Sequence, residues 1–426
     1  MARKRLKRSH SDKAAGWSFR PSRRSLVFAL VAVLGAVVAL ANTAVNVLHA
    51  RAPDLALAID RNDPVALIRS AQLKRAAGDP AARSNQAVLS VVQRSVRRLP
   101  INGPAFRLYG LSSATNSDLE AMRRQMRLSD RMERRDVATQ LWLIENAVEQ
   151  NDVSRTLRHY DTALRIEESS RALLYPVLTD AMDSALIRER FQPYLKANPP
   201  WLESFLRFAV SKTETPVSLA ELARLNEGWP EGNAFSSLDT ELLARLFANE
   251  DYTQAADHFR RIKAVDRSIL TSLRLTDAST NWQRAPIAWQ PFKIDGIETY
   301  ILASAEGAGA VEIEADVEAG YKGPVARKFL ALEPGRYRLS SAMRSENFSR
   351  SDTARWVLSC AGAGTNLPLV REDVELRQTM MLEADFAVPD DCPIQSLLVS
   401  TNTLVGTGYV KVILASATLE AQPSTR

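Results

Sequence analysis

The chain has 426 residues, more than one hydrophobic core usually organises, so its length predicts two folded domains beside any terminal segments. Its formal net charge is +6, but residues 1–25 carry nine basic side chains against Asp12 alone, which gives that segment +8 and leaves −2 for residues 26–426. Because the basic excess is confined to this tail, overall charge excludes nucleic acid as a partner of the folded domains.

The basic tail (1–25) is followed by an apolar segment, residues 26–48, which contains 23 residues and no charged side chain. A helix of that length, at about 1.5 Å per residue, crosses a hydrocarbon core of about 30 Å. We expect a single-pass protein of the bacterial inner membrane, with the tail in the cytoplasm and the bulk in the periplasm, because basic flanks stay inside. A cleavable signal peptide is the alternative, with cleavage after Ala41 or Ala52.

Residues 49–278 show helical periodicity with Asp, Asn, Gly and Pro between the segments, which predicts an all-α region. Asn62 and Pro64 recur forty residues later as Asn102 and Pro104. Each pair is expected to precede a helix, because proline is favoured in the first helical turn. Residues 77–80 break the helix between these two starts, so the expected unit is helix, turn, helix.

Two stretches of this region resemble tetratricopeptide repeats. In residues 136–166 the spaced packing positions of that family are matched by Leu143, Ala147, Tyr160 and Ala163. Two other family positions differ, at Ile144 and Thr156, while residues 242–262 repeat the second-helix spacing with Ala255 and Phe259. The resemblance implies stacked helix pairs that leave a concave surface for a protein partner. An irregular helical bundle is the alternative.

Residues 279–419 alternate apolar and polar side chains between turn residues, which predicts a β domain, and residues 420–426 are expected to be a flexible C-terminus. The clearest strand is 311–317, and residues 325–345 suggest a hairpin around Pro334-Gly335. With the later segments 356–360, 386–389 and 408–414, this pattern resembles jelly-roll carbohydrate-binding and galactose-binding-like modules. The resemblance implies a β-sandwich.

The sequence has only two cysteines, Cys360 and Cys392, and both lie on the side of the anchor that we expect to be exported. A pair within one domain in an oxidising compartment predicts a structural disulfide. Two buried free thiols are the alternative.

Few patterns in the sequence point to catalysis. The four histidines are separated in the chain, and no zinc-protease, serine-hydrolase or Walker motif occurs, so we expect neither enzymatic activity nor a cofactor. Carboxylate-only glycosidase chemistry needs no histidine. One strand carries acids at every second position, but a solvated strand face shows the same pattern: Glu312, Glu314, Asp316 and Glu318. Calcium coordination by Asp390 and Asp391 is equally unspecific.

Aromatic side chains are common platforms for sugars, and four in the β domain are candidates for glycan contact: Trp282, Trp289, Tyr300 and Tyr321. Packing in the domain core, or against the last helix, is the alternative for the two tryptophans.

A local excess of arginine follows the anchor. Residues 83–135 contain eleven arginines, no lysine and four acids. Seven of the arginines recur at helical spacing and predict a surface for an anionic lipid, an acidic polysaccharide or an acidic partner protein: Arg94, Arg97, Arg98, Arg123, Arg127, Arg131 and Arg134. A solvated face that balances nearby acidic helices is the alternative.

These observations favour a membrane-anchored periplasmic scaffold that supports cell-envelope work such as assembly or export of an exopolysaccharide. Two other hypotheses remain: a carboxylate-based glycan hydrolase or lyase, and a secreted glycan-binding protein if the anchor is cleaved.

Overall fold

The computed structural model describes residues 23–113, 119–235, 237–263, 265–281, 287–304, 309–361, 368–406 and 408–423. The chain divides into two compact units, the first ending at Leu143 and the second beginning at Ile144. The basic tail that the sequence analysis assigned to the cytoplasm lies almost wholly outside the described residues.

The first helix, α1 (Arg23–Arg51), is long and apolar enough to cross a membrane, and its span Leu30–Arg51 has a mean hydropathy of 2.1 with 6% of its window buried. Large apolar side chains along it are exposed, among them Phe28 at 74% and Leu40 at 70%. This finding confirms the predicted apolar helix. A membrane anchor and a signal sequence both fit it.

The other helices of the first unit are shorter, and several of them begin at side-chain caps. They are α2 (Pro53–Ile59), α3 (Pro64–Ala76), α4 (Pro80–Arg83), α5 (Asn85–Arg98), α6 (Gly103–Ser113) and α7 (Leu119–Met132), and α8 (Val137–Glu149) crosses the boundary between the units. The carboxylate of Asp63 accepts from the Ala66 amide, with Pro64 in the first turn, and Asp79 and Pro80 repeat this arrangement before α4. The predicted helix starts and the break at 77–80 are therefore confirmed.

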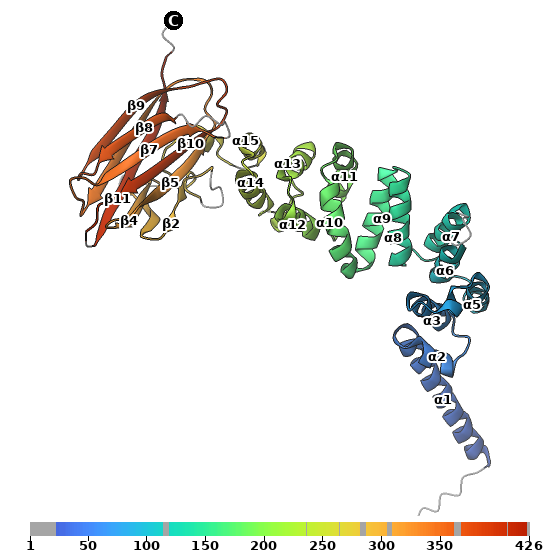
Figure 1. Cartoon of the computed structure of the whole chain (residues 1–426). Coiled ribbons are helices and arrows are strands. Elements are labelled where there is room, and N and C mark those ends of the chain that lie inside the picture. Colours follow the sequence, from blue (N-terminus) through green and yellow to red (C-terminus); the bar gives the residue numbers. More distant parts are fainter. Residues whose placement is uncertain are drawn as a thin grey trace, which may run out of the picture. The chain divides into compact units, whose positions relative to one another are not determined.

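In the second unit the helices stack in two rows (Figure 1). One row contains α9 (Val153–Ile166), α11 (Ala185–Ala197), α13 (Pro216–Leu225) and α15 (Tyr252–Arg261), and the other contains α10 (Arg171–Ala181), α12 (Leu202–Lys212) and α14 (Leu238–Ala248). The residues that matched the repeat spacing are buried: Leu143, Ala147, Tyr160, Ala163, Ala255 and Phe259. The predicted helical region is thus confirmed, while its assignment to the tetratricopeptide family stays a prediction.

Aromatic packing joins the last helices to the β domain within the second unit. The Phe329 ring lies 4.7 Å from Phe247 and 5.2 Å from Tyr252, measured between centroids. The Ala331 amide donates to the Leu270 carbonyl at 2.7 Å. Apolar packing of the sandwich begins before residue 279, because Leu273 and Leu275 belong to its core.

The C-terminal part is an antiparallel sandwich of two sheets (Figure 1). One sheet has the order β1 (Gln290–Pro291), β5 (Lys322–Leu330), β10 (Gln395–Asn402), β7 (Thr353–Cys360) and β8 (Pro368–Glu375). The other has the order β2 (Lys293–Ile294), β3 (Ile297–Ala303), β4 (Val311–Glu318), β11 (Tyr409–Ala421), β6 (Gly335–Glu346) and β9 (Met380–Val388). Successive strands switch sheets repeatedly, as in a jelly roll, so the predicted all-β sandwich is confirmed.

The predicted hairpin around Pro334-Gly335 is wrong in its pairing. Both strands exist, but β5 pairs with β1 and β10, whereas β6 pairs with β9 and β11. The intervening residues therefore carry the chain from one sheet to the other. At the opposite end of the domain, β11 extends to Ala421, two residues beyond the predicted domain limit.

Cys360 and Cys392 form the predicted disulfide, with their Cα atoms 5.3 Å apart. The bond joins the end of β7 to the segment between β9 and β10 and closes a loop with a sequence separation of 32. The bond therefore links β7 covalently to the segment that precedes β10, in addition to the hydrogen bonds between these two strands.

Replacing both cysteines with serine should lower the free energy of unfolding of the sandwich by about 3 to 4 kcal/mol, because the loop regains conformational entropy when the domain unfolds. Urea denaturation of the wild-type and double-serine proteins measures the difference. Equal denaturation midpoints, or two thiols that alkylate without reduction in exported protein, would contradict a structural role for the bond.

Lys328 is fully buried in β5, and its Nζ donates to the Ile287 carbonyl at 2.9 Å. Burial penalises the ammonium form and lowers the pKa of Lys328 to about 7 from 10.5. Because the unfolded chain holds this proton up to a higher pH than the folded chain does, stability should rise between about pH 7 and pH 10.5.

The Lys328→Met variant should flatten this rise and should be more stable than wild type at pH 7 by up to about 5 kcal/mol, since it removes the cost of burying an amine. Denaturant midpoints measured from pH 6 to pH 10 test both effects. Parallel pH profiles for the two proteins would show that Lys328 titrates normally in the folded state.

Candidate functional site

A cavity of about 610 Å³ lies among α13, α14 and α15. The chain leaves α13 at Leu225 and begins α14 only at Leu238, a longer connection than most helix-to-helix links. Gly228 and Gly232 within it have φ angles of +114° and +130°, which other residues rarely adopt. Glycine is therefore needed at these two positions for the connection to follow one side of the cavity.

Trp229 supplies an aromatic surface to this cavity, and Phe235 and Ile262 add apolar area. The indole Nε1 of Trp229 is buried and has no hydrogen-bond partner within the described part of the chain. An unsatisfied buried donor is costly, and because this atom is closed to solvent, Trp229 offers the cavity its ring and not its N–H group.

His258 forms the polar floor of the same cavity with Asp239. The His258 ring is 5% exposed, and its Nε2 lies 2.9 Å from Asp239 Oδ1. The contact joins α15 to α14 and fixes the orientation of the imidazole. The pair can therefore orient a ligand in the cavity or hold α14 against α15.

The rim of the cavity presents donors and acceptors side by side. Arg260 contacts Asp257 at 2.7 Å, and Lys263 lies 3.9 Å from Glu231. Arg261 and Arg267 are exposed on the rim as well. An aromatic wall with such a rim suits a ligand rich in hydroxyl groups, because both donors and acceptors are available to it.

The four aromatic residues that were predicted to contact a glycan differ in their exposure. Trp289 is fully buried and donates from Nε1 to the Leu273 carbonyl at 3.2 Å, so it is a core residue, which corrects the expectation of surface contact. Trp282 lies outside the described residues. Tyr300 is half-buried on β3, with Lys293 Nζ 4.9 Å from its ring centroid, and Tyr321 is 40% exposed in the turn after β4. Of the three candidates that the structure describes, Tyr300 and Tyr321 are thus accessible.

Two of the four acids on β4 form ion pairs with nearby strands. Glu312 pairs with Arg344 at 2.6 Å, and Glu314 pairs with Lys411 at 2.6 Å. This arrangement is typical of a polar sheet face. Among the described residues no group of three or more His, Cys, Asp or Glu side chains is arranged to hold a metal ion.

The predicted arginine surface lies on α5, α7 and the turn before α8. All seven arginines are exposed except Arg123, which is partly buried and contacts Glu120 at 2.7 Å. Arg98 contacts Asp60 at 2.6 Å. Arg127 and Arg131 have no ion-pair partner within the described part of the chain and leave positive charge at the surface of α7.

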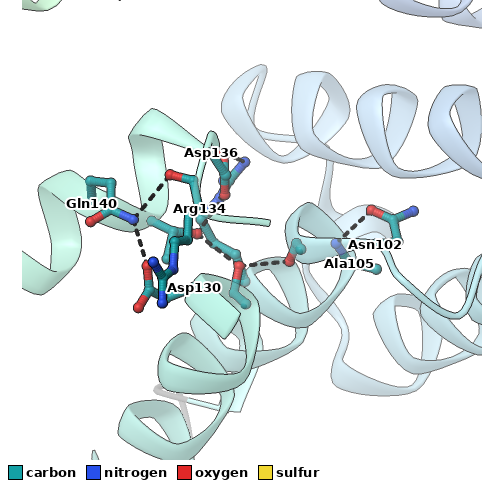
Figure 2. A network of polar contacts seen from close by, with 10 residues as sticks. Asn102, Ala105, Asp130, Arg134, Asp136 and Gln140 are labelled. Atoms are coloured by element: carbon teal, nitrogen blue, oxygen red, sulfur yellow. Dashed lines mark hydrogen bonds and ion pairs between the residues drawn. The ribbon is translucent and has the colours of Figure 1, made fainter. Parts of the chain in front are cut away.

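A buried polar network holds the helices beneath this surface (Figure 2). Asp136 accepts from Arg107 Nε at 2.6 Å and from the Thr139 hydroxyl, and Ser129 donates to the Gly103 carbonyl at 2.8 Å. Gln140 donates to Asp130 at 2.7 Å and to the Arg134 carbonyl at 3.3 Å. These contacts fix α6, α7 and the turn that carries the last arginines.

No family model and no curated protein sequence matches the chain. Solved structures similar to it include TmCBM61 in complex with β-1,4-galactotriose, at 14% identity and a TM-score of 0.24, covering 32% of this chain and 90% of the other. The C-terminal family 22 carbohydrate-binding module of Clostridium thermocellum Xyn10B shares 16% identity, with a TM-score of 0.25 and coverages of 35% and 99%. The CBM22-2 xylan-binding domain of Paenibacillus barcinonensis Xyn10C shares 11%, with a TM-score of 0.25 and coverages of 35% and 98%.

Sequence reasoning missed the cavity residues Trp229 and His258. One signal was present, since residues 226–237 combine two glycines, a proline and a tryptophan over a length unusual for a link between helices. The pairing of His258 with Asp239, nineteen positions apart, had no such signal.

Proposed function

We propose that this chain is a membrane-anchored binding protein of the bacterial cell envelope that holds an envelope polysaccharide during its assembly or export. The cavity beside Trp229 is the observation that carries the proposal. Its volume of about 610 Å³ lies within the range of ligand pockets, about 300 to 1,000 Å³. Its aromatic wall suits the apolar face of a sugar ring, and its paired charged groups suit ring hydroxyls.

Location in the envelope is supported by the two ends of the chain. The exposed apolar surface of α1 suits a lipid environment, and the basic tail before it favours a cytoplasmic N-terminus. The disulfide between Cys360 and Cys392 suits an oxidising compartment.

Fusions after Ser279 should test this topology. Alkaline phosphatase fused there is expected to be active, because the enzyme folds only after export, and the chain should remain in the membrane after alkaline extraction. An inactive phosphatase together with an active cytoplasmic reporter would reverse the topology, whereas a mature protein that begins near Asn42 would make α1 a signal peptide.

Substitution of Trp229 tests the ligand. We expect Trp229→Ala to weaken binding of the full chain to envelope polysaccharide about tenfold, since stacking on an aromatic ring contributes on the order of 1 to 3 kcal/mol. Binding is measured by affinity electrophoresis in detergent, with Tyr300→Ala as the matched aromatic control in the sandwich.

The pattern of losses separates the alternatives. Loss of binding in the Tyr300 variant alone would move the site to the sandwich, and wild-type protein that binds no envelope polysaccharide would overturn the proposal. Release of reducing sugar by the wild-type protein would favour the glycan hydrolase.

A protein scaffold is the second candidate, and α10 favours it. Ala172, Leu173, Pro176 and Val177 form one exposed apolar face of this helix, with Leu173 at 59% and Val177 at 54%. Exposed apolar faces of this kind mark protein contacts more often than chance. Replacement of Leu173 and Val177 with serine would abolish partner recruitment in that case, while polysaccharide binding at Trp229 would be unchanged.

A further inference from the structure

The end of α1 is part of the folded first unit. Val45 is 7% exposed and packs with Ala56 of α2 and Ala66 of α3. Further toward the N-terminus, the apolar side chains of the same helix are exposed, as Leu40 shows. The transition from exposed to buried apolar residues marks where an apolar solvent would end and protein packing begins.

A groove of about 540 Å³ opens beside this transition. Ala50, one residue before the end of α1, lines it together with apolar residues from three other segments: Val65, Leu99, Ile101 and Met132. Ile101 is 64% exposed, and the other three are between 36% and 37%. We call these four residues the apolar collar, because they surround the groove at the exit of α1. Their exposure is unfavourable in water.

Positive charge flanks the apolar collar. Within the groove, Arg107 and Asp136 neutralise each other at 2.6 Å, and the lining also contains one further basic and one further acidic residue, Arg69 and Glu133. Outside it, Arg97 lies two residues before Leu99, and Arg131 directly precedes Met132. Both are exposed and have no ion-pair partner within the described residues. Residues 51–143 as a whole hold 16 basic against nine acidic side chains.

We propose that the apolar collar, with Arg97 and Arg131, binds the anionic phospholipid surface of the leaflet from which α1 emerges. This inference rests on the proposed function, in which α1 is a membrane anchor. Ile101 and Leu99 insert at headgroup depth, and the two guanidinium groups contact lipid phosphates. Lipid is the occupant that the groove favours, because any bilayer that contains α1 brings headgroups to Ala50. The first unit is therefore held against the membrane surface as well as tethered to it.

The experiment uses the full chain in lipid nanodiscs made from phosphatidylcholine alone or with phosphatidylglycerol added. Hydrogen exchange of peptides that cover residues 97–104 and 127–135 is expected to be slower in the anionic discs, and the difference should shrink at high salt. Ile101→Ser should remove the difference at 97–104, while Arg97→Gln and Arg131→Gln should each lower the protection about fivefold. Ile294→Ser, an exposed isoleucine of the sandwich, is the matched control and should change nothing.

One result would overturn the inference: identical exchange of these peptides in the two kinds of disc, whether or not phosphatidylcholine alone protects them. The arginine variants keep the test decisive if Ile101→Ser unfolds, because Arg97 and Arg131 are surface residues. Alkaline extraction of membranes tests the anchor separately. If the chain is released, α1 is not an anchor and the proposed function fails as well. If the chain is retained but anionic discs give no extra protection, only the lipid contact is contradicted.

Discussion

The structure depends first on a helix that has no protein partner for most of its apolar surface. The side chains of α1 from Val27 to Val47 are largely exposed, and each large one costs roughly 1.5 to 3 kcal/mol in water relative to a buried position. Burial in an apolar medium, or against another protein, would remove that cost. Because Val45 already packs on α2 and α3, the folded part of the first unit begins within about two helical turns of the exposed apolar stretch of α1.

The second constraint is that buried polar side chains need hydrogen-bond partners. Ser129 and Thr139 are buried in the first unit and Asp136 is half-buried, and each has a partner, so the network specifies one arrangement of α6, α7 and α8. Gly103 is required at this junction, because a Cβ atom there would lie 2.6 Å from the Glu133 Cβ. Lys328 is the contrasting case, since its single carbonyl partner leaves an amine whose pKa falls to about 7 through burial.

The sequence predicted elements better than it predicted partners. Alternation of side chains in β4 identified the strand and its buried face, since a period of two encodes inside and outside. The same period carries no information on which strand pairs with which, and for that reason β5 and β6 were joined wrongly into a hairpin. Trp289 shows the same limit at a single position: its residue type suits a sugar platform or a core, and only its burial decides. The disulfide was predictable because two cysteines allow one pairing.

A binding role for an anchored chain requires little affinity from each site. When one element is tethered, a second contact forms at an effective concentration set by the tether, so weak contacts become occupied together. The exposed arginines of α7 and the cavity beside Trp229 present different chemistry, the first dominated by charge and the second by an aromatic wall with balanced charges. Salt should therefore act unequally on them, because exposed charges are screened within about 10 Å at 0.1 M ionic strength whereas aromatic stacking is not. Salt dependence is consequently the physical property that would separate a surface contact at the arginines from binding at the proposed site beside Trp229.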